Sequence, residues 1–316
     1  MNLIGHDRQI GYLNSCRSRG TLPHAYLFHG PEHVGKLTVA LMLAQSFFCA
    51  LAQKDDIRSV CGECVSCRAI SEYRHPAVIM LDTTHTLVSK KEIRKELPIE
   101  DIRELKRVLS FAPAGGEWRL AIINEADRMS EEAANAFLKL LEEPGANTLL
   151  ILVAPHKDLL LPTILSRTQT VGFLTVSDEV LQETLRKEKT PSEEHEELLA
   201  FAGGRPGILL QLRKDPELLA EQQKRFREIR GALKKRDMVA LLRVSEQISG
   251  DAALRETAVS CVIGNLRSEL KNGSDSANAG NIIKKIKRID RIAGLIDSTN
   301  INPRLACDVM FLESMA

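Results

Sequence analysis

The sequence predicts an α/β domain built on a parallel sheet, followed by a region made of helices only. Over residues 1–174, short apolar runs alternate with helix-like patterns, as expected when helices cover the faces of a parallel sheet. The first of these runs leads directly into a glycine-rich loop that begins at Gly30. Strand-like runs end at about Thr175, after which the patterns are helical.

Five short segments are predicted as strands. Most are apolar without the alternation of a half-exposed strand, so we expect strands that are buried inside the sheet. The segments are residues 25–28, 77–81, 120–123, 149–153 and 170–173.

The helices between these strands are predicted from their spacing and their end residues. One begins near Lys36, and its apolar run continues to Ala52. A second covers residues 101–109, where apolar side chains recur at helical spacing. A third begins after Ser130, a good N-cap residue, and stops at Pro144, which cannot continue a helix.

The second half of the chain is predicted to be helical. Short helical patterns occupy residues 177–187, 192–202 and 207–212, and a longer, highly charged helical region starts at Pro216. A loop-forming spacer at 271–276 interrupts this region. Beyond it, apolar residues repeat with spacings of four and three, which predicts a helix with one packing seam. The seam residues are Ile282, Ile286, Ile289, Ala293 and Ile296.

The composition is that of an ordinary globular protein. With 316 residues, 44% hydrophobic and 27% charged, the chain is long enough for two or three domains. The net charge of +1 creates no overall field for nucleic acid, so any DNA contact must come from a local surface. The N-terminus does not resemble a signal peptide, and the longest apolar run, residues 37–52, is shorter than a membrane span. We therefore expect a cytoplasmic protein that does not enter a membrane.

The loop after the first predicted strand follows the phosphate-binding pattern G-x-x-x-x-G-K-[S/T] except at its last position. Gly30, Gly35 and Lys36 are present, but Leu37 replaces the hydroxyl residue that binds Mg²⁺. Thr38 lies one residue too late, where its hydroxyl points to another side of the helix. The strand before the loop and the apolar helix after it are the context that the motif requires. We expect a degenerate nucleotide-binding loop rather than a chance glycine-rich turn.

The strand predicted at 120–123 is followed by Asn124 and Glu125. In nucleotide hydrolases with such a loop, the corresponding strand ends in an Asp that holds Mg²⁺ and a Glu that activates water. Glu125 can still act as a base, whereas Asn124 is a neutral and weaker metal ligand. The metal site therefore loses one ligand at Leu37 and another at Asn124. The alternative is that Asn124 and Glu125 only terminate the strand.

Four of the seven cysteines lie close together in the sequence, at Cys49, Cys61, Cys64 and Cys67. In a chain expected in the cytosol, such spacing is typical of a metal site rather than of disulfides. Four thiolates can surround Zn²⁺ in a tetrahedron, and such a closed shell is structural rather than catalytic. The sequence thus predicts structural zinc, with a redox pair or unconnected core cysteines as alternatives. The other cysteines are predicted as core residues: Cys16, Cys261 and Cys307.

Several motifs resemble those of bacterial replicative clamp-loader subunits, an AAA+ family, over nearly the whole chain. Residues 24–30 resemble the family's strand into the phosphate-binding loop. Residues 135–144, N-A-F-L-K-L-L-E-E-P, resemble its highly specific helix N-A-x-L-K-x-L-E-E-P. Residues 161–167 resemble the segment that ends in S-R-C, with Thr168 in place of the cysteine. Residues 302–305 resemble the start of the last collar helix.

This resemblance implies an AAA+ P-loop domain with a parallel sheet over residues 1–174, with a zinc module inserted at 49–67. It further implies a helical lid over residues 175–213 and a helical collar, used for oligomerisation, over residues 214–316. Arg167 occupies the family's arginine-finger position, from which a guanidinium acts on the ATP site of a neighbouring subunit. The alternative is an ordinary loop arginine in a surface salt bridge.

The departures from the active members of this family indicate a subunit that does not hydrolyse ATP. Besides the two lost metal ligands, the position of the usual phosphate sensor holds Ala154-Pro155-His156, in which only His156 offers a partial substitute. In the lid, Arg205 is displaced by one residue from the arginine that reaches the nucleotide in active subunits. We therefore expect little or no ATP binding at the chain's own site and no intrinsic ATPase activity.

The resemblance implies a ring member of the DNA polymerase III clamp-loader complex, which opens the sliding clamp and places it on primed DNA. The implied partners are gamma/tau-type and delta subunits, the sliding clamp and, within the assembly, primed DNA. The nucleotidyltransferase chemistry belongs to the polymerase holoenzyme and not to this chain. Two alternatives remain open. One is a gamma/tau-like ATPase that uses Thr38 and Glu125, and the other is a zinc-dependent DNA-binding module on an AAA+ scaffold.

Overall fold

The computed structural model describes residues 3–53, 55–88, 95–110, 118–187, 195, 198–199, 201–212, 216–272, 276–298 and 301–315. The chain divides into two compact units, Met1–Leu174 and Thr175–Ala316. The first unit contains the sheet, and the second is helical throughout its described secondary structure. The finer division of the second unit into a lid and a collar stays a prediction.

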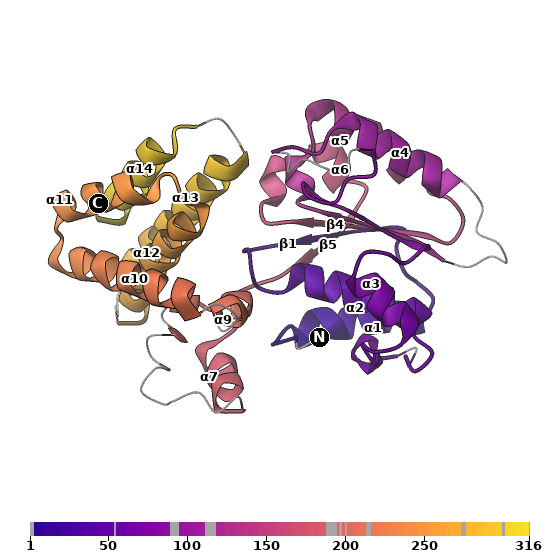
Figure 1. The fold of residues 1–316 in the computed structure, drawn as a ribbon, viewed down its shortest axis with the longest axis horizontal. Coiled ribbons are helices and arrows are strands. Elements are labelled where there is room, and N and C mark those ends of the chain that lie inside the picture. The colour runs from indigo at the N-terminus through magenta and orange to yellow at the C-terminus, as the bar shows by residue number, and fades with distance from the viewer. Residues whose placement is uncertain are drawn as a thin grey trace. The chain divides into compact units, whose positions relative to one another are not determined.

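The first unit is built on a five-stranded sheet in which all neighbouring strands run parallel (Figure 1). The order β2-β3-β4-β1-β5 places β1 between β4 and β5, so that both of its edges are paired. All five predicted strands are confirmed, with ends that differ by at most one residue. They are β1 (Ala25–His29), β2 (Val78–Leu81), β3 (Arg119–Asn124), β4 (Thr148–Ala154) and β5 (Gln169–Gly172).

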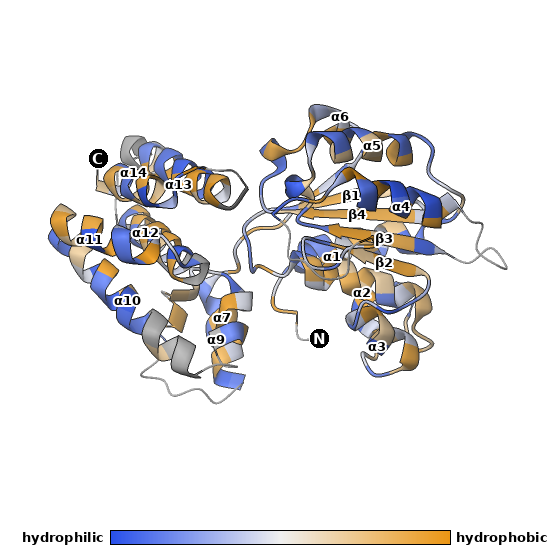
Figure 2. Cartoon of the chain, turned by 45° about the horizontal axis from the view of Figure 1, so that its top comes forward, coloured by the Kyte–Doolittle hydropathy of each residue, from blue (hydrophilic) through white to orange (hydrophobic). Residues whose placement is uncertain are grey.

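Helices cover both faces of the sheet, which explains why its strands are so uniformly apolar (Figure 2). Along β1, Tyr26 and Phe28 belong to the core on one face, whereas Leu27 belongs to the core on the other. All three side chains are fully buried. One face carries α1 (Asp7–Ser18), α2 (Lys36–Phe48) and α3 (Val65–Ser71), and the other carries α4 (Ile99–Ser110), α5 (Glu131–Glu142) and α6 (Pro162–Leu165).

The helix that follows the phosphate-binding loop is shorter than its apolar run. The run continues to Ala52, but α2 ends at Phe48. Cys49 leaves the helix in an extended conformation, with φ −78° and ψ 123°, and its sulfur lies beside that of Cys61. The helix therefore ends earlier than its hydrophobic pattern predicts, at the point where Cys49 joins the cysteine cluster.

The third predicted helix is confirmed as α5, and it begins at the predicted N-cap. Ser130 Oγ accepts a hydrogen bond from the Ala133 N–H at 3.1 Å, which satisfies one of the N–H groups that a first helical turn leaves unpaired. The helix ends at Glu142, just before Pro144. The second predicted helix, over 101–109, is confirmed as α4.

The second unit confirms most of the predicted helices. The pattern at 192–202 falls largely outside the described residues. Of the predicted spacer at 271–276, residues 271–272 belong to α12, which ends at Asn272, and Ser276 begins α13. Residues 273–275 lie outside the described part. The helices are α7 (Asp178–Lys187), α9 (Pro206–Leu212), α10 (Pro216–Lys235), α11 (Met238–Ile248), α12 (Ala252–Asn272), α13 (Ser276–Ser298) and α14 (Pro303–Met315).

The predicted packing seam lies along α13. Ile282, Ile289 and Ile296 are buried, and Ile286 and Ala293 between them are half-buried. The helix packs against α12 and α14. Among the helices that the structure describes, none is both long enough and apolar enough to span a membrane.

Candidate nucleotide site and metal centre

The predicted phosphate-binding loop connects β1 to α2. Gly30 and Gly35 have φ angles of 132° and 111°, which residues with a side chain rarely adopt. A Cβ atom on Gly30 would lie 2.0 Å from the carbonyl oxygen of Phe173, so the loop requires glycine at this position. Gly35 is the N-cap residue of α2, and the N–H groups of the first helical turn therefore face the loop. These glycines and the helix N-terminus are the backbone features on which the predicted anion-binding loop depends.

Lys36 is buried against the loop that precedes it. Its Nζ atom donates hydrogen bonds to the carbonyl oxygens of Gly30 and Pro31, both at 2.6 Å. The residue is only 7% exposed. In a nucleotide-loaded loop of this kind the lysine contacts phosphate oxygens. Here its ammonium group stabilises the loop through the loop's own carbonyls.

Leu37 occupies the position at which the motif has its Mg²⁺ ligand, and it packs against the core. Leu37 is partly buried and packs against the apolar core on the α2 face of the sheet. Thr38 is half-buried one residue further along α2, about 100° around the helix axis. Leu37 thus contributes apolar contact where a nucleotide hydrolase needs an oxygen ligand.

Asn124 and Glu125 come to the same edge of the sheet as the loop, because β3, β4 and β1 are parallel neighbours. Asn124 is the last residue of β3, and Glu125 follows it with a φ of 55°. The Glu125 Oε2 atom accepts a hydrogen bond from Thr83 Oγ1 at 2.5 Å. Thr83 is buried just after β2, and no sequence motif marks it, since the two residues meet only across neighbouring strands.

Asp127 is a second carboxylate at this edge that the sequence motifs do not mark. It lies in the short 3-10 helix η3 (Ala126–Arg128), and its Oδ1 atom is buried with no hydrogen-bond partner among the described residues. Burial raises the pKa of Asp127 to about 6, although a backbone N–H, His156 and Arg128 act in the opposite direction. The Glu32 carboxylate of the loop adds to the increase. Three segments thus bring Glu32, Asp127 and His156 within electrostatic range of one another.

Arg167 follows α6 and remains partly accessible. Its Nη1 donates hydrogen bonds to the carbonyl oxygen of Thr163 at 3.2 Å and to Ser166 Oγ at 3.3 Å. Its Nη2 lies 3.0 Å from Oε1 of Glu142, the last residue of α5. The isolated chain therefore places Arg167 in a surface ion pair, the alternative that the sequence left open, while 38% of the side chain stays exposed.

Arg205, the predicted lid arginine, lies in the second unit. Arg205 lies directly before α9, and its Nε donates a hydrogen bond to the carbonyl oxygen of Ala202 at 3.4 Å. The guanidinium of Arg267 on α12 donates to the Gly203 carbonyl oxygen at 2.6 Å. This second contact joins the segment before α9 to α12 within the same unit.

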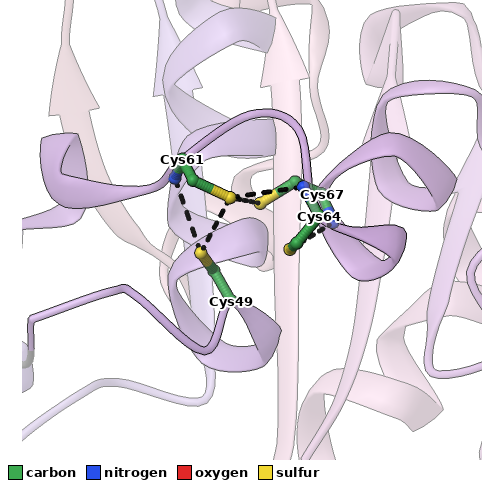
Figure 3. Close-up of side chains that lie close together, drawn as sticks. All are labelled: Cys49, Cys61, Cys64 and Cys67. Atoms are coloured by element: carbon green, nitrogen blue, oxygen red, sulfur yellow. Dashed lines mark hydrogen bonds between the residues drawn. The ribbon is translucent and has the colours of Figure 1, made fainter.

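The four clustered cysteines come together beside α2 and α3 (Figure 3). Cys49 follows α2, Cys61 lies between the two helices, Cys64 is the N-cap residue of α3, and Cys67 lies inside α3. The sulfurs of Cys49 and Cys61 are 3.6 Å apart, and those of Cys61 and Cys67 are 3.9 Å apart. All four sulfurs lie within 4.8 Å of one another, so the residues form one group that could hold a metal ion.

The geometry of this group fits a tetrahedral metal ion better than disulfides. Zinc–sulfur bonds of about 2.3 Å place the sulfurs of a tetrahedron about 3.8 Å apart, close to the two separations given above, whereas a disulfide bond is only about 2.0 Å long. Backbone N–H groups of Cys64 and Glu63 lower the pKa of Cys61 to about 6, which favours its thiolate. Burial raises the pKa of Cys67, and a bound cation would offset this effect.

Side chains of α1 and α2 hold the cysteine-bearing segment in place. Gln45, buried on α2, donates from Nε2 to the carbonyl oxygen of Cys67 at 3.0 Å and to Ser71 Oγ at 2.9 Å. Arg17 on α1 donates to the carbonyl oxygen of Gln53 at 2.8 Å. Neither Gln45 nor Arg17 belongs to a recognisable motif, because each acts largely through backbone carbonyls that any sequence supplies.

Comparisons with known proteins place the chain in a family. The model of the family described as DNA polymerase III, delta subunit matches residues 5–177, more than half of the chain. The chain is 32% identical over 178 residues to the DNA polymerase III subunit delta' of Bacillus subtilis, covering 56% of this chain and 50% of the relative. It is 35% identical over 188 residues to the subunit delta' of Pseudomonas aeruginosa, covering 58% and 53%. The chain thus spans about half the length of these relatives.

Two further similarities are to proteins with other subunit names. The chain is 30% identical over 194 residues to the DNA polymerase III subunit tau of Escherichia coli, covering 61% of this chain and 28% of that relative. A solved DNA polymerase III, gamma subunit-related protein from Thermotoga maritima aligns over 96% of this chain and 98% of that chain, at 18% identity and a TM-score of 0.38.

The parallel sheet and the glycine-rich loop that follows β1 define an α/β protein, and the sequence matches relate it to subunits of DNA polymerase III. The chain belongs to the DNA polymerase III delta subunit family, and two of the relatives above are named delta' subunits.

The raised pKa of Asp127 predicts a specific pH dependence of stability. Because the folded state binds this proton more tightly than the unfolded chain, ionised Asp127 destabilises the fold above pH 6, and the penalty disappears as the pH falls toward 4. We expect Asp127→Asn to raise the free energy of unfolding at pH 8 by up to about 3 kcal/mol and to have little effect near pH 4. Urea titrations across this pH range measure the difference.

Asp158→Asn serves as the control, because Asp158 is an exposed aspartate in the nearby segment Lys157–Leu159. It should leave the stability nearly unchanged at every pH. A constant difference between Asp127→Asn and wild type from pH 4 to pH 8 would show that charge burial at Asp127 is not the cause.

Proposed function

We propose that this chain acts as a delta-prime-type subunit of a DNA polymerase III clamp loader. In this role it is a comparatively rigid ring member that does not hydrolyse ATP and donates Arg167 to the ATP site of a neighbouring gamma/tau-type subunit. The observation that carries the proposal is a loop with the glycines and lysine of the phosphate-binding pattern, in which Leu37 takes the metal-ligand position and packs against the core. Family membership and the delta' relatives support the same assignment.

The argument against hydrolysis rests on the divalent cation. Mg²⁺ requires oxygen ligands at nearly ideal octahedral geometry, and phosphoryl transfer depends on it to neutralise developing charge. Leu37 offers no oxygen, and Asn124 offers only a neutral amide. Glu125 is held by Thr83 at 2.5 Å, so the remaining carboxylate of the motif is engaged within the protein. We expect a site that binds nucleotide weakly or not at all.

Arg167 is suited to act on a neighbouring subunit. It follows a short helix at the surface, and its guanidinium is partly exposed. An arginine finger supplied by one subunit to another stabilises charge on the transferring phosphate and raises the rate by about 10³ to 10⁵ in related phosphoryl transfers. The chain would thus contribute to ATP hydrolysis without an ATP site of its own.

The proposed role implies a set of partners. These are gamma/tau-type and delta subunits of the same ring, the sliding clamp that the ring opens, and primed DNA inside the assembled complex. The polymerase chemistry belongs to other subunits of the holoenzyme. A cytoplasmic location accompanies this role, and it would keep the four clustered thiols reduced and able to bind metal.

We assign the collar role to residues 214–316 because an apolar stripe remains uncovered there. On α14, Leu305, Val309 and Leu312 are 61%, 45% and 50% exposed, and their spacing places them on one face of the helix. The neighbouring helix α11 adds Val239 and Leu242, also exposed. Such a stripe suits the collar of an adjacent ring subunit.

The two alternatives predict different behaviour. A gamma/tau-like ATPase is favoured by the presence of Glu125 and by the similarity to subunit tau, and it requires Mg²⁺-dependent hydrolysis by the chain alone. A zinc-dependent DNA-binding module requires strongly salt-dependent DNA binding by the chain alone. Its net charge of +1 offers no general support for that activity.

The finger role predicts the effect of Arg167→Ala on the assembled complex. We expect no measurable ATPase activity from the purified chain. In a complex with gamma/tau-type and delta subunits, Arg167→Ala should slow the ATP site that this chain faces by about 10³-fold or more, because charge on the transferring phosphate loses its counter-ion. Single-turnover hydrolysis resolves this site as a separate slow phase.

The matched control is Arg103→Ala, which removes an exposed arginine from α4 on the same unit. It should leave every hydrolysis phase unchanged. Rapid Mg²⁺-dependent hydrolysis by the lone chain would refute the proposal and favour the gamma/tau-like alternative.

We further propose that the four-cysteine group binds one structural zinc ion per chain. Metal analysis of the purified protein should give one equivalent of zinc, and Cys64→Ser should lower it. At free zinc about a hundredfold above its dissociation constant, the ion should add about 3 kcal/mol of stability, which chelation removes. Cys16→Ser, outside the group, is the control and should retain the metal. Equal zinc contents in the two variants would contradict the assignment.

The collar assignment predicts that charge on α14 blocks assembly. Replacing Leu305 and Val309 together by Asp should weaken association with the other ring subunits by about tenfold or more, since a buried unpaired charge is costly. Analytical ultracentrifugation of the mixtures measures this. Lys284→Asp, on the exposed side of α13, is the control. Unchanged assembly of the double variant, with a normal helical spectrum, would exclude this surface.

A further inference from the structure

We propose that Glu142 is a positioning residue for Arg167. Its carboxylate orients the guanidinium at the end of α6 so that the remaining N–H donors face a nucleotide on a neighbouring subunit. This inference rests on the proposed function of Arg167, and it adds a residue that no sequence motif assigns to that function.

The pair is formed by two elements that are distant in the sequence. Glu142 ends α5, Arg167 follows α6, and the two helices pack against each other (Figure 1). The Nη2–Oε1 separation of 3.0 Å is therefore a tertiary contact rather than a neighbouring-turn pair on one helix. It connects the motif at 135–144 with the motif at 161–167, which the sequence shows only as separate segments.

The position of Glu142 is unfavourable unless a cation accompanies it. The carboxyl end of a helix carries partial negative charge, so a carboxylate in the last turn is repelled by its own helix. Arg167 supplies the compensating charge. Because both side chains are about half exposed, at 38% and 50%, the pair contributes little to the stability of the fold. The ion pair therefore matters more for the orientation of the Arg167 guanidinium than for the free energy of unfolding.

Some hydrogen-bond donors of Arg167 bind groups within the chain, and others remain for a phosphate on a neighbouring subunit. A guanidinium has five N–H donors in a rigid plane. Nη1 donates to Thr163 and Ser166, and Nη2 faces Glu142. Within the described part of the chain, these contacts leave the Nε–H and the second N–H of Nη2 for another acceptor. Two donors in one plane match the oxygens of a phosphate.

Glu142→Gln tests the proposal, because it keeps the shape of the side chain and removes its charge. In the assembled complex, we expect the hydrolysis phase that depends on Arg167 to slow about two- to fivefold, where fivefold corresponds to about 1 kcal/mol. The affinity of the chain for its partners and the KM for ATP should not change, since the variant alters the orientation of the finger and not the interface. Glu142→Asp should recover part of the rate.

Two controls separate positioning from other effects. Glu143→Gln changes the adjacent exposed glutamate and should have no effect on any hydrolysis phase. In the Arg167→Ala background, Glu142→Gln should cause no additional loss, because Glu142 acts only through Arg167. Thermal melting of each variant checks that the fold is intact.

Each other outcome overturns the inference in a distinguishable way. If Arg167→Ala leaves the rate unchanged, the finger function fails, and the role of Glu142 fails with it. If Arg167→Ala slows ATP hydrolysis but Glu142→Gln leaves the rate unchanged or raises it, only the positioning role fails. If Glu142→Gln slows hydrolysis equally in the Arg167→Ala background, Glu142 acts independently of the finger.

Discussion

The pairing of β1 with β4 on one side and β5 on the other is the interaction on which the first unit depends. β1 is paired along both edges and buried on both faces, and the glycine-rich loop begins at its carboxyl end. There the loop meets the backbone at Phe173, and only glycine fits between the two segments at Gly30. The same parallel order brings the ends of β3 and β4 to this edge. One strand register therefore places the loop, Glu125 and His156 together.

In the proposed nucleotide site, the shape of the loop and the metal ligands depend on different interactions. The shape comes from backbone conformation and core packing, and Lys36 reinforces it by binding the loop's own carbonyls. The proposed loss of metal binding depends on a few side chains, among them Leu37 and Asn124. A leucine at position 37 adds apolar contact with the core, which favours folding, while it removes a ligand that catalysis requires.

How far sequence patterns predict each feature depends on the range of the interaction involved. The five strands follow from short apolar runs, and the start of α5 follows from Ser130, because both depend on neighbouring residues. The end of α2 does not follow from its apolar run, since Cys49 leaves the helix to join a cluster formed with residues beyond it. No sequence motif marks Thr83 or Asp127. Thr83 contacts Glu125 only because their strands are neighbours in the sheet, and Asp127 is distinguished only by the burial of its Oδ1 atom.

The sequence by itself determined the fold class, the position of the glycine-rich loop after β1, the cysteine group and the family. Each of these depends on residue types at short, regular spacings, which local geometry converts directly into structure. Only the tertiary structure decided which carboxylate meets Arg167, which hydroxyl holds Glu125 and which aspartate loses its solvent. Those outcomes depend on helix packing and strand order, which bring together segments far apart in the chain. Residue spacing along the sequence does not predict which of these segments come into contact.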